Sequence, residues 1–408
     1  MSWLHDATRE MLGLARQAQA AGVFPYFRPF SNVGPRVTIG GREYLNFTSN
    51  DYLGLSQHVE VKRAAAAAIE RFGTGLGSSR LQATCILHEE LEERLARWLG
   101  YEACAVFPSG YQALVGVLSA YLGNASLVAL DNQAHASILD GVTLAKGAAP
   151  ELEERFFRHN SVSALERILV GSDRTQKLAV VEGLYGADGD LAPLPELVRV
   201  CAEQHTPLLV DDAHGIGALG AHGRGAAEHA GVAERIDILV GTFSKVFGGV
   251  GGFVCAGKDL IEFLKLSARS FVFSASLPAA QVAGALAALE LVEHDTALRP
   301  RLARNQEILR GGLRALGCEL GASVAHVCPI LLGDEALTMT FGARLFHEAH
   351  VILLPFIYPG VPLGHARLRC NVTAAHSESD LTRVIEAVKA IGNELGVFHA
   401  EARAKVPQ

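Results

Sequence analysis

The 408-residue sequence lacks features that mark several classes of protein. Basic residues are not in excess, since 36 Lys and Arg face 43 Asp and Glu and the net charge is −7 at pH 7. This acidic balance argues against a protein that binds nucleic acid or an anionic membrane. Long apolar runs are also missing, because the most apolar stretch, residues 277–292, is short and contains Gln281 and Glu290. We therefore expect no membrane-spanning segment.

The cysteines lack the spacing of a disulfide framework or a metal site. Seven are scattered along the chain, and no two form a C-x-x-C pair. Such an odd, scattered set is typical of reduced thiols that act as small buried hydrophobes. The first 22 residues carry charges throughout and contain no unbroken apolar segment, so we expect no signal peptide. The sequence thus predicts a cytoplasmic protein without a metal site.

What the chain has in quantity is apolar sequence in short blocks. Apolar residues make up 49% of it, which excludes a mainly disordered chain and suffices for a large core. Helical stretches separate many of the blocks, and this alternation indicates an α/β protein with a mostly parallel sheet covered on both faces. The blocks that we interpret as buried strands are ACAVF (103–107), LAVVE (178–182), PLLVDD (207–212), IDILVG (236–241) and GGFVCA (251–256).

The ends of the chain have a different pattern. Residues 3–22 fit an amphipathic helix, and residues 37–47 fit a hairpin around Gly40-Gly41. After an Ala-rich helix near 278–294, longer helices and short strands indicate a smaller α+β domain. We expect three parts: a helix and hairpin segment at 1–50, a large α/β domain at 51–293 and a C-terminal α+β domain at 294–408.

Two residues that could take part in catalysis lie at or just after the ends of predicted strands. Proteins with a parallel sheet usually bind their ligands at the carboxyl ends of its strands. Lys245, in GTFSKVFGG, has small neighbours and could form a Schiff base if its pKa were lowered. Asp211, in DDAH, closes a buried strand, where a carboxylate is costly unless it is paired or functional. It could pair with the protonated ring nitrogen of pyridoxal 5′-phosphate (PLP). Taken alone, Lys245 could be an ordinary surface lysine, and Asp211 could be a metal ligand or a helix cap.

Two further features complete the pattern. Ser109-Gly110-Tyr111 joins a strand to a helix start and could offer backbone N–H groups to a phosphate. His135, in a turn before a helix, could stack on a planar cofactor. An ordinary helix cap and a structural histidine are the alternatives for each feature alone. The four features in this order and spacing are together specific.

Nearly the whole sequence resembles the α-oxoamine synthase family of fold-type I PLP-dependent transferases. The family condenses an amino acid with an acyl thioester, from CoA or an acyl carrier protein, and releases CO₂ and the thiol. The resemblance therefore implies a PLP acyltransferase with a mostly parallel central sheet. The motifs that carry it are SNDYLGL (49–55), GTGLGSSRL (73–81), LHEELE (87–92), FPSGYQA (107–113), HASILDG (135–141), RHN (158–160), EGLYGADGDLAPL (182–194), VDDAHGIGALGAHGRG (210–225), GTFSK (241–245), FSASLP (273–278) and ARLRCNVTAAH (366–376).

The resemblance assigns catalytic roles to four residues. Lys245 corresponds to the lysine that forms the Schiff base with PLP and later removes the Cα proton of the substrate. Asp211 corresponds to the partner of the pyridine nitrogen, and His214 to the contact of the ring hydroxyl oxygen. His135 corresponds to the residue stacked on the ring, which also helps to orient the substrate.

The resemblance also assigns residues to the carboxylate of the amino acid substrate and to the phosphate of PLP. Asn50 and Arg369 correspond to the residues that hold the carboxylate of the amino acid. Because family sites are shared across a homodimer, Ser274 or Ser276 is expected to reach the phosphate bound by a second subunit. The expected phosphate contacts within the subunit are Ser109, Gly110, Tyr111 and Thr242.

The substrate evidence in the sequence is divided. Gly186 stands where the family usually has Ser near the cofactor hydroxyl, which puts one cofactor hydrogen bond in doubt. Ile357 stands where 8-amino-7-oxononanoate synthases and some serine palmitoyltransferases have Arg. GTFSK, RHN and FVFSASLP favour a serine palmitoyltransferase-like enzyme, which joins L-serine to a long-chain acyl-CoA to give 3-ketosphinganine. The alternatives are a 2-amino-3-ketobutyrate CoA ligase (glycine C-acetyltransferase) and an 8-amino-7-oxononanoate synthase.

Two other functions fit the same fold. A PLP aminotransferase would need only the sheet, the lysine and the aspartate, because a fold does not fix a function. A non-catalytic partner subunit is the weaker alternative, since such a chain would lack the Schiff-base lysine and Lys245 is present.

Overall fold

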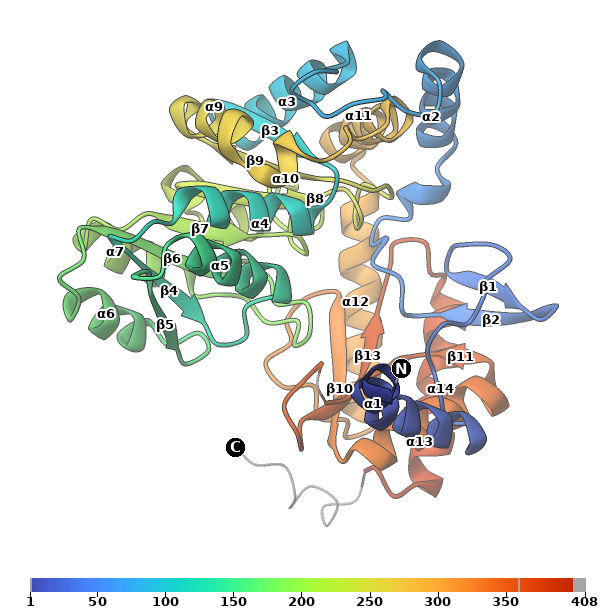
Figure 1. The fold of residues 1–408 in the computed structure, drawn as a ribbon. Helices are drawn as coiled ribbons and strands as arrows, with labels where there is room; N and C mark the ends of the chain where they lie inside the picture. The colour runs from blue at the N-terminus through green and yellow to red at the C-terminus, as the bar shows by residue number, and fades with distance from the viewer. Residues whose placement is uncertain (1, 359, 399–408) are drawn as a thin grey trace. The chain divides into compact units, whose positions relative to one another are not determined.

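The computed structural model describes residues 2–358 and 360–398, which form two compact units (Figure 1). The large unit comprises Asn50–Gly186 and Asp190–Pro300. The small unit comprises the described residues of Met1–Ser49, Ala187–Gly189 and Arg301–Gln408. No helix in the described ranges is both long and apolar enough to span a bilayer.

A seven-stranded sheet forms the centre of the large unit. Strand β9 is antiparallel to both β3 and β8, whereas β8, β7, β6, β4 and β5 are parallel neighbours. Six strands therefore share one direction, which confirms the predicted mostly parallel sheet. In sheet order the strands are β3 (Ala103–Phe107), β9 (Gly252–Ala256), β8 (Ile238–Thr242), β7 (Leu208–Asp211), β6 (Gln176–Glu182), β4 (Ser126–Asp131) and β5 (Glu153–Phe157).

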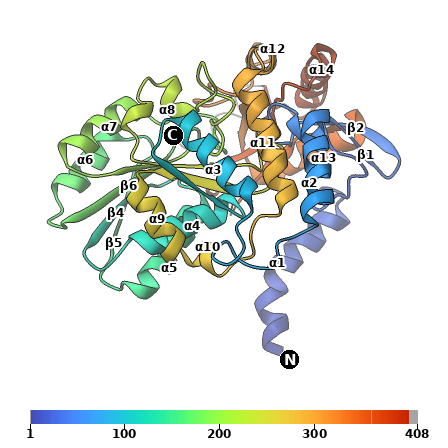
Figure 2. The same ribbon diagram turned by 90° about the horizontal axis from the view of Figure 1, so that it is seen from above.

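Helices cover both faces of this sheet, as predicted. Figure 2 shows α4, α5, α9 and α10 on one face and α6 and α7 on the other. Apolar side chains such as Val128, Val180 and Val240 pack with the first group in one continuous buried cluster. The helices of the large unit are α2 (Val59–Phe72), α3 (Ile86–Leu99), α4 (Gly110–Tyr121), α5 (Ala136–Ala148), α6 (Val162–Val170), α7 (Leu194–Glu203), α8 (Ala226–His229), α9 (Lys258–Ser267), α10 (Arg269–Val272) and α11 (Ala279–His294).

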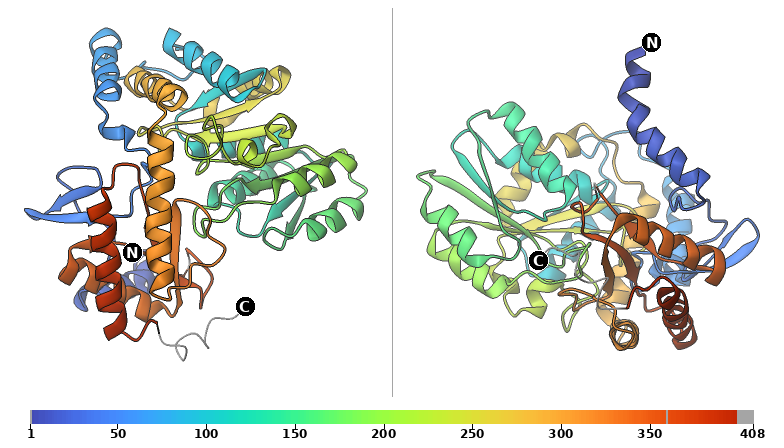
Figure 3. Two further views of the ribbon diagram at one scale, coloured as in Figure 1. Left: turned by 180° about the vertical axis from the view of Figure 1, so that it is seen from behind. Right: turned by 90° about the horizontal axis from the view of Figure 1, so that it is seen from below.

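The small unit contains two three-stranded sheets (Figure 3). The predicted hairpin is present as β1 (Arg36–Ile39) and β2 (Arg42–Asn46), joined by Gly40 and Gly41. Both glycines have positive φ, 56° and 79°, the backbone conformation that a tight two-residue hairpin turn requires. Strand β11 (Val351–Ile352) pairs with β2, which brings residues 1–49 into the same unit as the C-terminal segment.

The second sheet of the small unit is antiparallel and has the order β10 (Val327–Gly333), β13 (Ala366–Asn371) and β12 (Leu354–Phe356). The apolar run at 351–355, whose sequence fits a single strand, is divided between β11 and β12, which lie in different sheets and are separated by Leu353. The remaining helices are α1 (Ser2–Ala20), α12 (Leu298–Ala315), α13 (Glu335–Ala349) and α14 (Glu378–Glu394).

Candidate active site

A cavity of about 270 Å³ lies at the carboxyl edge of the parallel strands. It receives side chains that follow β3, β4, β6, β7 and β8, because parallel strands bring their carboxyl ends to one edge. The cavity is lined by eight of the twelve predicted site residues: Ser109, Gly110, Tyr111, His135, Asp211, His214, Thr242 and Lys245.

One corner of the cavity is suited to a phosphate. Ser109 caps α4 and accepts a hydrogen bond from the Gln112 amide (3.1 Å). Gly110 and Tyr111, the first residues of this helix, line the cavity. The Thr242 hydroxyl packs against this helix start, since a Cβ on Gly110 would lie 3.1 Å from the Thr242 Cβ. Helix N-termini and hydroxyl groups are common ligands of phosphate.

The opposite part of the cavity is acidic. Asp211 and Glu182 are register partners at the ends of β7 and β6, and both are buried. Burial and the nearby Asp211 raise the pKa of Glu182 well above its ordinary value. Burial also raises the pKa of Asp211, but the positive charge of Lys245 and the imidazole of His135 oppose that rise. We therefore place the proton of this pair on Glu182 and the negative charge on Asp211.

His135 caps α5 and lies in the cavity wall. Its Nδ1 accepts a hydrogen bond from the Ser137 amide (3.3 Å) and lies 2.6 Å from the Ser137 hydroxyl. Burial lowers the pKa of His135, and Lys245 adds to that effect, while Asp211 opposes it. A neutral imidazole in this position can stack on a planar ligand without adding charge.

Lys245 follows β8 in a turn in which the amide of Gly248 donates to the Lys245 carbonyl (3.0 Å). Gly248 has a φ of +64°, and a Cβ there would lie 2.3 Å from the backbone nitrogen of Ser56. The glycine thus permits close packing of the turn that carries the lysine. Lys245 influences the pKa values of three lining residues, Asp211, Glu182 and His135, so its charge acts directly on the cavity.

Four predicted site residues do not line this cavity. The buried Ser276 hydroxyl donates to the carbonyls of Ser78 (2.8 Å) and Ala83 (3.0 Å), so it holds its own loop. Ser274 accepts a hydrogen bond from Gln112 (2.9 Å). Asn50 accepts one from Tyr52 (3.2 Å) in the large unit. Arg369 lies on β13 of the small unit and donates to Asn371 (3.0 Å). Their roles toward cofactor and substrate stay predictions.

Sequence reasoning missed polar groups that the structure places in the lining. Glu182, Ser137 and Ser244 all belong to it. Glu182 closes an apolar strand in the same way as Asp211, so the same strand-end signal could have identified it. The serines carry no comparable signal, because a single serine at a turn is ordinary.

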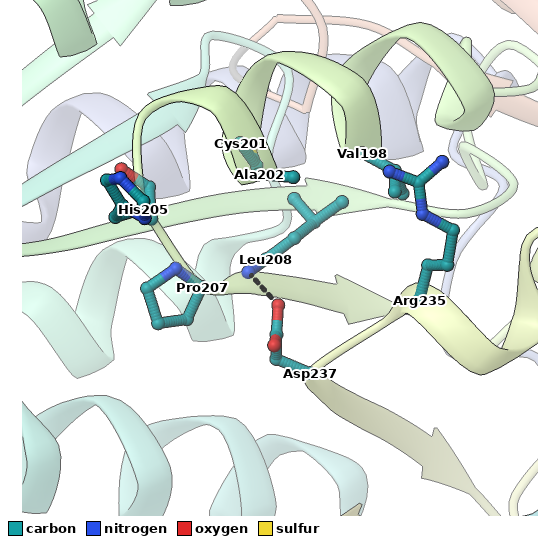
Figure 4. Close-up of a pocket in the computed structure, with 9 residues that line it drawn as sticks. Val198, Cys201, Ala202, His205, Pro207, Leu208, Arg235 and Asp237 are labelled. Atoms are coloured by element: carbon teal, nitrogen blue, oxygen red, sulfur yellow. Dashed lines mark hydrogen bonds between the residues drawn. The ribbon is translucent and has the colours of Figure 1, made fainter.

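A second cavity, of about 370 Å³, lies where β7 and β8 begin, away from their carboxyl ends (Figure 4). Two of its polar side chains already have partners within the fold. Asp237 accepts a hydrogen bond from the Leu208 amide (2.8 Å), and Thr206 donates to the Gln204 carbonyl (3.1 Å). Burial, together with the charge of Asp237, raises the pKa of Cys201 to about 12, so its thiol is inert. We do not assign a site to it.

Comparisons with known proteins show which family the chain belongs to. The aminotransferase class I and II family matches residues 42–388. The chain is 44% identical over 401 residues to 8-amino-7-oxononanoate synthase of Geobacter sulfurreducens, covering 96% of this chain and 100% of that protein. The structure resembles serine palmitoyltransferase of Sphingomonas wittichii, with a TM-score of 0.92, 34% identity and coverage of 97% and 99%. A serine palmitoyltransferase structure with PLP is similar at a TM-score of 0.92 and 32% identity, with the same coverage.

Proposed function

The chain belongs to the aminotransferase class I and II family, within its α-oxoamine synthase group of PLP-dependent acyltransferases, and from this premise we propose that it synthesises 8-amino-7-oxononanoate. The observation that carries the proposal is the 44% identity to an 8-amino-7-oxononanoate synthase along that protein's whole length. The structural likeness to serine palmitoyltransferase is at 34% identity. Serine palmitoyltransferase, favoured by three motifs of the sequence, is thus the less supported substrate assignment.

The product name defines the two substrates chemically. Carbon 8 carries the amine and carbon 9 is a methyl group, so the amino acid contributes the Cα and side chain of alanine. Carbons 1–7 form a chain with a carboxylate at its far end and a ketone at its near end, so the acyl donor is a seven-carbon dioic acid thioester. The new bond joins the alanine Cα to the thioester carbonyl carbon. The thiolate leaves, and the original alanine carboxylate departs as CO₂.

The cavity fits PLP by the chemistry of its lining. The α4 N-terminus and Thr242 match a phosphate, Lys245 matches an aldehyde, and the anionic Asp211 matches a protonated ring nitrogen. When bound, PLP supplies a ring that withdraws electrons from the substrate Cα. Ser109, Gly110, Tyr111 and Thr242 would hold its phosphate.

Lys245 then moves the proton. With PLP in the cavity, the Nζ of Lys245 would take up the Cα proton of alanine. Asp211 would keep the ring nitrogen protonated, because an ionised carboxylate beside a cation favours the charged pair. Arg369 and Asn50 hold the carboxylate during this step, so that the proton, not CO₂, leaves first.

The subunit is expected to act as a homodimer. Large apolar side chains are exposed: Tyr111, which lines the cavity, is 48% exposed, Phe273 75% and Leu81 56%. Phe273 immediately precedes Ser274, one of the two serines expected to reach the second subunit's phosphate. A partner that covered Phe273 would therefore lie close to Ser274.

Release of free thiol tests the proposal. Purified protein loaded with PLP is given L-alanine, L-serine or glycine, each with heptanedioyl-CoA or palmitoyl-CoA. We expect CoA and CO₂ in equal amounts only from L-alanine with heptanedioyl-CoA, and none from a Lys245→Ala variant. Turnover of L-serine with palmitoyl-CoA would instead identify a serine palmitoyltransferase. Keto acid formation without a thioester would identify an aminotransferase.

A further inference from the structure

Ser137 and His135 form a hydrogen-bonded pair at the start of α5, in the wall of the cavity. The backbone amide of Ser137 donates to Nδ1 of His135 (3.3 Å), and the Ser137 hydroxyl lies 2.6 Å from the same nitrogen. Ser137 is fully buried, so solvent does not compete for these contacts. Two groups of one residue therefore converge on a single ring nitrogen.

The chemistry of the donors gives the direction of both contacts. A backbone N–H can only donate, so Nδ1 of His135 must present its lone pair to the Ser137 amide. A ring nitrogen without a proton can only accept from a hydroxyl, so the Ser137 hydroxyl donates to it as well. Within the part of the chain that the structure describes, no second acceptor lies within hydrogen-bonding distance of that hydroxyl. Both contacts thus require the same form of the ring.

A neutral imidazole has one N–H, so a lone pair at Nδ1 places the proton on Nε2. We propose that Ser137 is a positioning residue that holds His135 as this tautomer, so that the imidazole presents a hydrogen-bond donor, and no proton-accepting nitrogen, to the reactants. This inference deepens the proposed function and rests on it. A donor suits an oxygen that gains negative charge, as the thioester carbonyl oxygen does when the carbon–carbon bond forms. Lys245 is then left as the group that accepts the proton.

The charges around His135 favour the neutral ring that this tautomer needs. Burial lowers the pKa of His135, Asp211 opposes that effect and Lys245 adds to it, while Asp140 of α5 also opposes it, and the net result is a lowered pKa. Protonation of Nδ1 would in addition break both contacts with Ser137. The titratable groups that share the cavity with His135 are Tyr111, Glu182, Asp211, His214 and Lys245.

Ring ¹⁵N chemical shifts test the tautomer directly, because they distinguish a nitrogen that carries a proton from one with a lone pair. The full chain is produced with ¹⁵N-labelled histidine, and the His135 signals are identified by their absence from a His135→Asn variant. We expect the proton on Nε2 and the lone pair on Nδ1 at neutral pH, with and without PLP. A proton on Nδ1, or a mixture of both tautomers, would overturn the proposal.

Ser137→Ala removes the hydroxyl donor and leaves the backbone amide in place. Because the hydroxyl stabilises only the neutral ring, its loss should raise the pKa of His135 by about 0.5–1, the worth of one neutral hydrogen bond. The matched control is Ser119→Ala, since the Ser119 hydroxyl donates to the Val115 carbonyl (2.6 Å) in α4 and does not line the cavity. An unchanged pKa in Ser137→Ala, or an equal rise in Ser119→Ala, would overturn the assignment. If Ser137→Ala does not fold, the tautomer of the unaltered protein still decides it.

Turnover separates this role from a purely structural one. With L-alanine and heptanedioyl-CoA, the ratio of the Ser137→Ala rate to the unaltered rate should fall about three- to tenfold as the pH is lowered through the pKa of His135. The reason is that a larger share of His135 is protonated in the variant. A ratio that does not change with pH would contradict the proposal. Failure of the unaltered protein to use this substrate pair would instead overturn the proposed function, whereas the ¹⁵N measurement involves no acyl thioester.

Discussion

Glu182 and Asp211 stand side by side at the ends of β6 and β7, and both carboxyl groups border the cavity. Two buried carboxylates this close do not both ionise readily. Lys245 and His135 favour the charged form of Asp211, while Asp211 itself favours the protonated form of Glu182. The pair therefore carries one negative charge, located where a ring nitrogen needs a partner.

This division of charge predicts different effects of two amide substitutions. Glu182→Gln replaces a protonated carboxyl by a neutral group of the same shape and should leave PLP affinity within about twofold of the unaltered value. Asp211→Asn removes the anion and should weaken PLP binding by about 10- to 100-fold, the worth of a charge-assisted hydrogen bond. Titration of both apoproteins with PLP measures the difference. Equal losses, or a larger loss from Glu182→Gln, would show that the charge lies elsewhere.

His159 predicts a pH-dependent contribution to stability. Its ring lies 2.9 Å from Asp131 and 2.8 Å from Asp190. Burial lowers the pKa of His159, but the two carboxylates outweigh burial and raise it to about 10. Because the pKa is raised in the folded state, protonated His159 makes its full contribution to stability at pH values below the pKa of histidine in the unfolded chain, about 6.5. This contribution is lost as the pH rises through about 10.

The matched measurement is chemical denaturation of the unaltered protein and of His159→Asn across this pH range. The variant should be less stable by about 3–5 kcal/mol near neutral pH, because two buried carboxylates lose their cation. The difference in the free energy of unfolding between the two proteins should narrow as the pH rises toward 10, where the unaltered imidazole also loses its proton. A difference that stayed constant or widened with pH would contradict the ion-pair interpretation.

Ser274 and Ser276 are close in sequence but are expected to respond differently to alanine. Ser276→Ala removes two buried hydrogen bonds to the carbonyls of Ser78 and Ala83 and should lower the free energy of unfolding by about 1–3 kcal/mol. Ser274→Ala should leave stability within about 0.5 kcal/mol and weaken PLP binding to the dimer. Thermal unfolding and PLP titration of both variants separate the roles. A loss of PLP affinity confined to Ser276→Ala would reverse them.

Much of the large unit could be predicted from the sequence, because its central strands are uninterrupted apolar blocks. Strands β4 and β5 were missed. The β5 segment, Glu153–Phe157, is an edge strand with charged and exposed side chains, so it lacks the apolar pattern of a buried strand. SLVALD of β4 is apolar and is flanked by the turn residues Gly123-Asn124 and Asp131-Asn132, so this strand could have been predicted from the sequence. The division of 351–355 into two strands depends on which sheet each half joins, and local sequence does not encode that.

The site residues that could be predicted from the sequence are reactive side chains at the ends of predicted strands. Lys245, Asp211 and His135 each follow a strand, and the structure brings them into one cavity. The hydrogen bond between Tyr52 and His214 was not predictable, because 162 residues separate the two in sequence and neither the spacing nor the residue type marks the contact. The place of Gly186 against His214 is likewise a property of packing.

Lys245 is expected to form a covalent bond with PLP in this cavity. Borohydride reduction of the PLP-loaded protein, followed by peptide mass spectrometry, detects this bond. We expect a pyridoxyl group on the peptide that contains Lys245 and none in a Lys245→Ala variant. A pyridoxyl group on another lysine, or none on any lysine of a protein that binds PLP, would contradict it.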